Sequence, residues 1–129
     1  MKLMRRAEFL RQHEGTIYAK GGEMYFDGLA VKAETIGLSV AADGHVSGDW
    51  VYLDPCWIEA AGAEETFARL AEMLETGSSS PMAESYGRDG GFDQDAIFLV
   101  FERPDLERLR SLVDAAIAAS ESAGGASRV

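Results

Sequence analysis

The N-terminal half of the chain alternates apolar and polar residues in short runs, as expected of β-strands with one buried face. The clearest run covers residues 29–34, where Leu29, Val31 and Ala33 share one side and Lys32 lies on the other. Turn signals at Gly21-Gly22 and Asp43-Gly44 separate the runs. The strands predicted in this way cover residues 16–20, 23–27, 29–34, 36–40 and 50–53, with Val46 leading into the last.

Pro55 follows the last of these runs. A proline has no N–H to donate to a strand ladder, so it is found at sheet edges, strand ends and bulges. The sequence therefore predicts that this strand lies at an edge of the sheet or ends at Asp54.

The apolar period then changes to that of a helix. Within residues 63–76, Phe67, Leu70, Ala71 and Leu74 follow the spacing of one helical face, and Gly77 suits the residue after the last turn. A second long helix is predicted over 104–120, and a short N-terminal helix over 3–13. In the second long helix the residues expected to be buried are Leu106, Leu109, Val113, Ala116 and Ile117.

Between the two long helices, residues 96–102 are almost wholly apolar, which is typical of a strand covered on both faces. Residues 82–95 are polar and rich in glycine, and we predict a loop there. The sequence thus predicts an α+β fold: an antiparallel sheet of about four to six strands, with 96–101 central and the two long helices packed on it. Residues 1–119 are expected to form a single domain and 120–129 a flexible tail.

Composition narrows the class of protein. The single cysteine, Cys56, excludes an internal disulfide and a cysteine-based zinc site, which favours a reducing, cytoplasmic location. The basic N-terminus lacks the apolar segment of a signal peptide. The longest strongly apolar run is too short to span a bilayer, so no membrane association is expected.

No catalytic motif is present. Cys56 lacks an obvious histidine partner, because His13 lies in the predicted N-terminal helix and His45 in a turn. The two histidines also lack the spacing of a metal-binding pair. We therefore expect a non-enzymatic protein, with no catalytic, metal-binding or cofactor-binding residues and no cofactor.

The glycine-rich loop 84–95 leaves alternatives open. Its aspartates, with backbone carbonyls, have the chemistry to bind a hard cation, as a small metal-dependent enzyme would require, although their spacing is not that of an EF-hand. A partner contact is a second function that such a loop can have. The simplest reading is an ordered loop in which Arg88 pairs with an aspartate.

The net charge is −10 in 129 residues, with 22 acidic residues and 12 lysines and arginines. Such a surface repels nucleic acid and anionic membranes and favours a basic protein partner. Arg5, Arg6 and Arg11 form the main basic cluster, and we expect them to pair with the acidic remainder of the molecule.

Three aromatic residues accompany this charge in the region 49–59. If Val51 and Leu53 point inward, Trp50 and Tyr52 point outward as contact anchors with an acidic rim; alternatively a helix covers that face. With the aspartates and arginine of the glycine-rich loop, the residues predicted to contact a partner are Asp49, Trp50, Tyr52, Asp54, Trp57, Arg88, Asp89 and Asp93.

In size and charge the chain resembles the small acidic α+β proteins of mobile elements and toxin-immunity loci. That resemblance implies an inhibitor or immunity factor for a basic protein. Separately, carboxylates that alternate along a strand recur about every 6.6–7 Å, near two phosphate steps of one DNA strand, which is the spacing expected of a nucleic-acid mimic of the kind that phages use against host defences. The rival interpretation is a homodimeric structural or housekeeping domain whose aromatic residues lie at a two-fold interface.

Overall fold

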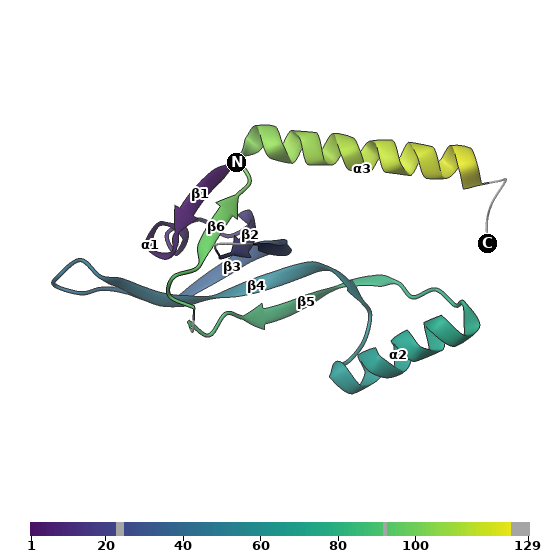
Figure 1. Cartoon of the computed structure of the whole chain (residues 1–129), viewed down its shortest axis with the longest axis horizontal. Helices are drawn as coiled ribbons and strands as arrows, with labels where there is room; N and C mark the ends of the chain where they lie inside the picture. Colours follow the sequence, from purple (N-terminus) through teal and green to yellow (C-terminus); the bar gives the residue numbers. More distant parts are fainter. Residues whose placement is uncertain (23–24, 92, 125–129) are drawn as a thin grey trace.

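A computed structural model describes residues 1–22, 25–91 and 93–124 of the chain (Figure 1). These residues form one antiparallel six-stranded sheet, with strand order β1-β6-β2-β3-β4-β5, and three helices. The α+β class predicted from the sequence is confirmed. The elements are β1 (Lys2–Arg5), α1 (Arg6–Phe9), β2 (Ile17–Gly21), β3 (Phe26–Val40), β4 (Val46–Ile58), α2 (Ala63–Thr76), β5 (Met82–Arg88), β6 (Ile97–Val100) and α3 (Arg103–Gly124).

The long hairpin of β3 and β4 forms the middle of the sheet. The predicted strands 29–34 and 36–40 are one strand, since β3 absorbs the break between them as register shifts against β4. Gly37 lies in the second shift with a φ of 65°, which a residue without a Cβ adopts without strain. The predicted turn at Asp43-Gly44 closes the hairpin, with the Asp43 carboxylate accepting a hydrogen bond from the His45 N–H.

The expectation for Pro55 is wrong. Strand β4 runs on to Ile58 and has β3 on one side and β5 on the other. The register of β4 against β5 shifts between Asp54 and Trp57, so Pro55 lies in a bulge, where no ladder N–H is required of it.

The loop predicted over 82–95 is also shorter than expected, because Met82–Arg88 is strand β5. This strand is at the edge of the sheet and most of its residues are exposed. A strand exposed on both faces needs no alternation of apolar and polar residues, so its sequence resembles that of a loop.

At the N-terminus, strand pairing replaces most of the helix predicted over 3–13. Residues Lys2–Arg5 form β1 on the edge of β6, and α1 is a single turn. Residues 96–102 behave as predicted: β6 lies inside the sheet, between β1 and β2. Of the predicted strand 23–27, Glu23 and Met24 lie outside the described residues.

The core is small and aromatic. Phe9 of α1 stacks on Phe98 of β6 with ring centroids 4.1 Å apart, and its ring meets that of Trp50 edge-on at 5.0 Å. The same buried cluster includes Leu10 and Tyr18, together with Met4, Ala96 and Val100. One helical turn therefore covers the sheet at the point where β6, β2 and β4 present their largest side chains.

The two long helices have nearly the predicted bounds but not the predicted packing. Helix α2 matches 63–76 and ends at Gly77, whose φ of 73° is the expected left-handed cap. Helix α3 runs on to Gly124, into the segment expected to be a flexible tail. Figure 1 shows both helices projecting from the sheet, outside the aromatic core.

The predicted burial of α3 is correspondingly wrong. Leu106 and Leu109 are half-buried, whereas Val113, Ala116 and Ile117 are exposed. An amphipathic pattern identifies an apolar face but not the surface that covers it. Neither of these helices, among the described residues, is long and apolar enough to cross a membrane.

Candidate functional site

The residues predicted to contact a partner fall into a buried network and an open surface. Trp50 belongs to the first, with 0% of its surface exposed. Its indole Nε1 donates a hydrogen bond to the Tyr18 hydroxyl at 2.9 Å, and the Arg6 guanidinium lies over its ring at 4.8 Å. The outward orientation is therefore wrong for Trp50, and its face is covered, although by α1 rather than by a long helix.

Asp49 is also buried, and its carboxylate is fully engaged. Oδ2 accepts a hydrogen bond from Arg88 Nε at 2.6 Å, and Oδ1 accepts from the backbone N–H groups of Trp50 and Gly90. Burial alone would raise the pKa of Asp49. The hydrogen bonds from Arg88, Trp50 and Gly90 outweigh burial and lower the pKa below its usual value.

Asp89 joins the loop after β5 to the N-terminal part of the chain. Its side chain is 6% exposed and lies between two cations, Lys20 Nζ at 2.9 Å and Arg6 Nη1 at 3.3 Å. Its Oδ2 also accepts the N–H of Gly91. Arg6 further donates to the carbonyl oxygens of Gly48 and Asp93, so the Asp93 backbone belongs to this network while its side chain is exposed.

The expectation that the N-terminal arginines pair with acidic residues holds for Arg6. The sequence did not identify Lys20 as its companion, nor Tyr18 as the partner of Trp50. Alternation along residues 16–20 places Tyr18 and Lys20 on the same face of the strand, and this was the sequence signal that could have identified them.

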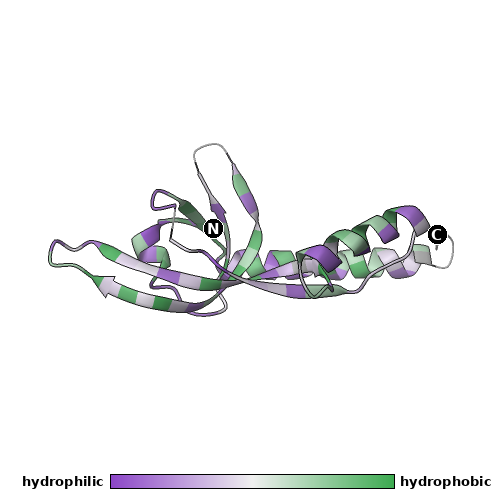
Figure 2. Cartoon of the chain, turned by 90° about the horizontal axis from the view of Figure 1, so that it is seen from below, coloured by the Kyte–Doolittle hydropathy of each residue, from purple (hydrophilic) through white to green (hydrophobic). Residues whose placement is uncertain are grey.

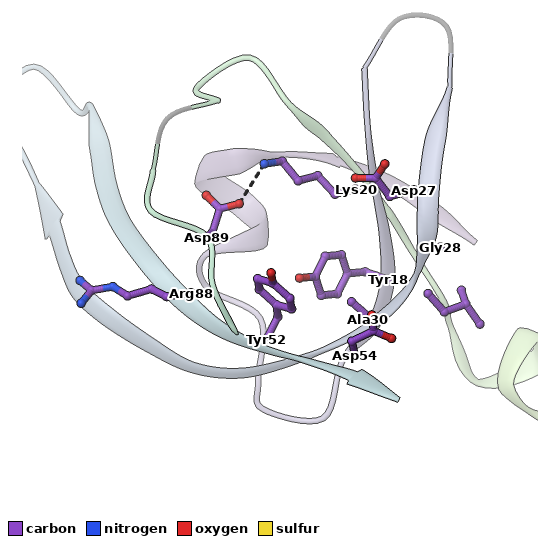
Figure 3. Close-up of a pocket in the computed structure, with 10 residues that line it drawn as sticks. Tyr18, Lys20, Asp27, Gly28, Ala30, Tyr52, Asp54, Arg88 and Asp89 are labelled. Carbon is purple, nitrogen blue, oxygen red and sulfur yellow. Dashed lines mark hydrogen bonds and ion pairs between the residues drawn. The ribbon is translucent and has the colours of Figure 1, made fainter. Parts of the chain in front are cut away.

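A hollow of about 410 Å³ opens beside this network (Figure 3). Tyr18 and Tyr52 point into it, and the Lys20–Asp89 ion pair borders it. Burial raises the pKa of Tyr18 to about 12, so its hydroxyl stays protonated at neutral pH. The cations of Lys20 and Arg88 are held by carboxylates. This chemistry suits a structural role for the network more than proton transfer.

The described residues contain no cluster of three or more histidine, cysteine, aspartate or glutamate side chains that could hold a metal ion. In the loop considered for a cation, Asp89 is held by Lys20 and Arg6, and Asp93 and Asp95 are exposed. The Cys56 side chain lies outside the described part of the structure.

A second hollow, of about 690 Å³, lies between β4, β5 and α2. Its apolar lining includes Trp57 and Phe67, which are 46% and 71% exposed. Its acidic lining consists of one residue from each of β4, β5 and the connection to α2, and no described lining residue is basic. We call this hollow the acidic groove, defined by Asp54, Trp57, Glu59, Phe67, Leu70 and Glu84.

The Asp49 network makes the stability of the fold depend on pH. The substitution Asp49→Asn isolates this dependence. Because the folded protein holds the pKa of Asp49 below its unfolded value, the carboxylate stabilises the fold above about pH 4, and this contribution is lost as the pH falls through the folded pKa. We expect Asp49→Asn to lower the free energy of unfolding by about 1–2 kcal/mol at pH 7.

Urea denaturation of the unsubstituted chain and of Asp49→Asn, between pH 2 and pH 7, measures the difference in their free energies of unfolding. It should shrink toward acid pH, because both side chains are then neutral. A difference that stays constant across this range would show that the charge of Asp49 contributes nothing.

Comparisons with known protein families, with curated proteins and with solved structures found no match to this chain. Function is therefore inferred from the chemistry of the surfaces described above.

Proposed function

We propose that this chain is a non-enzymatic interaction protein that binds a basic segment of a protein partner in the acidic groove, as an inhibitor or immunity factor does. The observation that carries the proposal is the combination of exposed Trp57 and Phe67 with acidic residues and no described basic residue in the same lining. Aromatic anchors surrounded by charge are the usual composition of an interface centre and its rim.

The groove retains part of the contact region expected from the sequence. Asp54 and Trp57 line it, whereas Asp49 and Trp50 are buried outside the groove and stabilise the fold. Helix α2 adds Phe67 and Leu70, whose helical spacing alone predicts packing on the sheet.

The net charge of −10 supports the same partner class. The acidic surface would attract a basic protein over a distance of about one Debye length, roughly 8–10 Å at ordinary ionic strength. Association would therefore be fast at low salt and slower as salt is added. Apolar contacts with Trp57 and Phe67 would then set the lifetime of the complex.

A synthetic amphipathic helical peptide with leucines on one face and arginines on its flanks is a direct probe of the groove. We expect it to bind, with backbone amide NMR shifts confined to β4, β5 and α2, while the same peptide with glutamates in place of the arginines does not bind. Equal binding of both peptides, or shifts away from the groove, would argue against the proposal.

Substitutions separate the two contributions. Phe67→Ala should weaken binding of the basic peptide about tenfold or more, mainly through a faster off-rate. Glu84→Lys should mainly slow association and reduce its salt dependence. Tyr86→Ala and Glu75→Lys are matched controls, since both residues are exposed and neither lines the groove. If the control substitutions weakened peptide binding as strongly as the groove substitutions, the assignment of the binding site to the acidic groove would be wrong.

A further inference from the structure

Helix α3 carries an apolar face that the rest of the described chain leaves uncovered. Leu112, Val113 and Ile117 are 55%, 51% and 53% exposed, and helical spacing places them on the same side as Leu109. Figure 2 shows green bands of apolar residues along the helix that leads to the C-terminus, beyond the sheet. An amphipathic helix takes most of its stability from packing of its apolar face, so this face is expected to have a partner.

A stripe of charges runs beside the apolar face. Arg103, Arg110, Asp114 and Glu121 are separated by seven, four and seven residues, which places all four on one flank of the helix. The N-terminal half of this flank also carries Glu107, which pairs with Arg103 at 2.9 Å, so that half has a net charge of +1 and the C-terminal half a net charge of −2. Arg103, whose side chain is 89% exposed, and its neighbours along the stripe are accessible to another chain.

The charges of this stripe are complementary to those of the same stripe on a helix that runs in the opposite direction. When a two-fold axis relates two antiparallel helices, the same flank of each helix faces that of the other. The residues along the two flanks then run in opposite directions. Since the arginines and the acidic residues have equal spacing, one alignment brings Arg110 opposite Asp114 and Arg103 opposite Glu121 at the same time. In a parallel pair this flank would face the other flank of the partner helix, and the charges would not meet.

Side-chain size favours the same arrangement. The N-terminal half of the face carries Leu106 and Leu109, and the C-terminal half carries Ala116 and Ala119 beside Ile117. Antiparallel pairing places the large residues of one copy opposite the small residues of the other, which fills the space between the helices. Parallel pairing would set Ala116 of one copy against Ala116 of the other.

We propose that α3 is a dimerisation helix that pairs antiparallel with α3 of a second copy of the chain. This contact is separate from the proposed binding of a basic partner, because the acidic groove is lined by β4, β5, α2 and the segment between β4 and α2. Each copy would keep its groove open.

Sedimentation equilibrium of the full chain tests the helix contact. We expect a dimer, and we expect Val113→Glu to raise its dissociation constant at least about tenfold, since a carboxylate would be buried without a partner. Ala118→Glu adds the same charge on the opposite side of α3 and should change the constant by less than about twofold. Near-ultraviolet circular dichroism, which reports on the aromatic core, should be unchanged in both variants.

Charge reversal tests the antiparallel order. The variants R103E/R110E and D114R/E121R should each fail to self-associate, because the first makes the whole stripe acidic and the second makes it basic at every position except Glu107. An equimolar mixture of the two should form a heterodimer.

Any of four outcomes would overturn the proposal. The unsubstituted chain could stay monomeric, or its dimer could be unaffected by Val113→Glu, which would place the contact on a surface other than α3. Self-association of the charge-reversed variants, or no heterodimer on mixing, would exclude the antiparallel arrangement. None of these outcomes bears on peptide binding in the groove.

Discussion

Trp50→Ala is expected to lower the free energy of unfolding by about 3–5 kcal/mol, enough to unfold a substantial part of a protein of ordinary stability. Trp50 is completely buried, and its loss would remove ring contacts with Phe9 and Phe98 and leave a cavity among them. The Tyr18 hydroxyl would lose its indole donor, and the Arg6 guanidinium would lose the ring beneath it.

Urea denaturation followed by far-ultraviolet circular dichroism measures this effect without relying on tryptophan fluorescence. Trp57→Ala is the matched control, because Trp57 is half-exposed in the acidic groove and should cost less than about 1 kcal/mol. Similar losses in the two variants would mean that Trp50 is not the centre of the core.

The second large effect is expected at Asp89. Asp89→Ala should lower the free energy of unfolding by about 3–5 kcal/mol, because it would leave Arg6 buried and without its carboxylate. Lys20, which is partly exposed, can turn toward water, so Arg6 accounts for most of the loss.

Two further variants distinguish a lost charge pair from a general disturbance of the loop. Asp93→Ala removes an exposed carboxylate nearby and should change stability by less than about 0.5 kcal/mol. Combining Arg6→Met with Asp89→Ala should recover part of the loss, since no buried cation then remains unpaired. If the double variant were less stable than Asp89→Ala alone, the interactions of Arg6 with Gly48 and Trp50 would outweigh its pairing with Asp89.

The role of Lys32 could not be predicted from alternation. The pattern of residues 29–34 suggested that Leu29, Val31 and Ala33 share the buried face, yet Lys32 is 1% exposed and Leu29 is exposed. The Lys32 ammonium group donates to the Thr35 hydroxyl, which in turn donates to the Leu10 carbonyl at the end of α1. Burial lowers the pKa of Lys32. Alternation identifies two faces, and the arrangement of α1 decided which one is covered.

Local signals were sufficient where neighbouring residues determine the structure. The bounds of α2, its glycine cap, the turn at Asp43-Gly44 and the apolar strand β6 follow from spacing and backbone conformation within a few residues, and the α+β class follows from these elements. Local signals were insufficient for segments whose pairing partner is distant in sequence. Strands β1 and β5 both form by pairing along a sheet edge, and residues far along the chain supply that edge.

The sequence by itself thus determined the element types, the acidic charge and the residues from which a contact surface could be built. Only the tertiary structure decided that Trp50 and Asp49 are buried, that Trp57 and Phe67 share a groove, and that α3 leaves the sheet with its apolar face uncovered. The physical reason is that periodicity records which residues share a face, whereas burial depends on what packs against that face, and distant parts of the chain supply that packing.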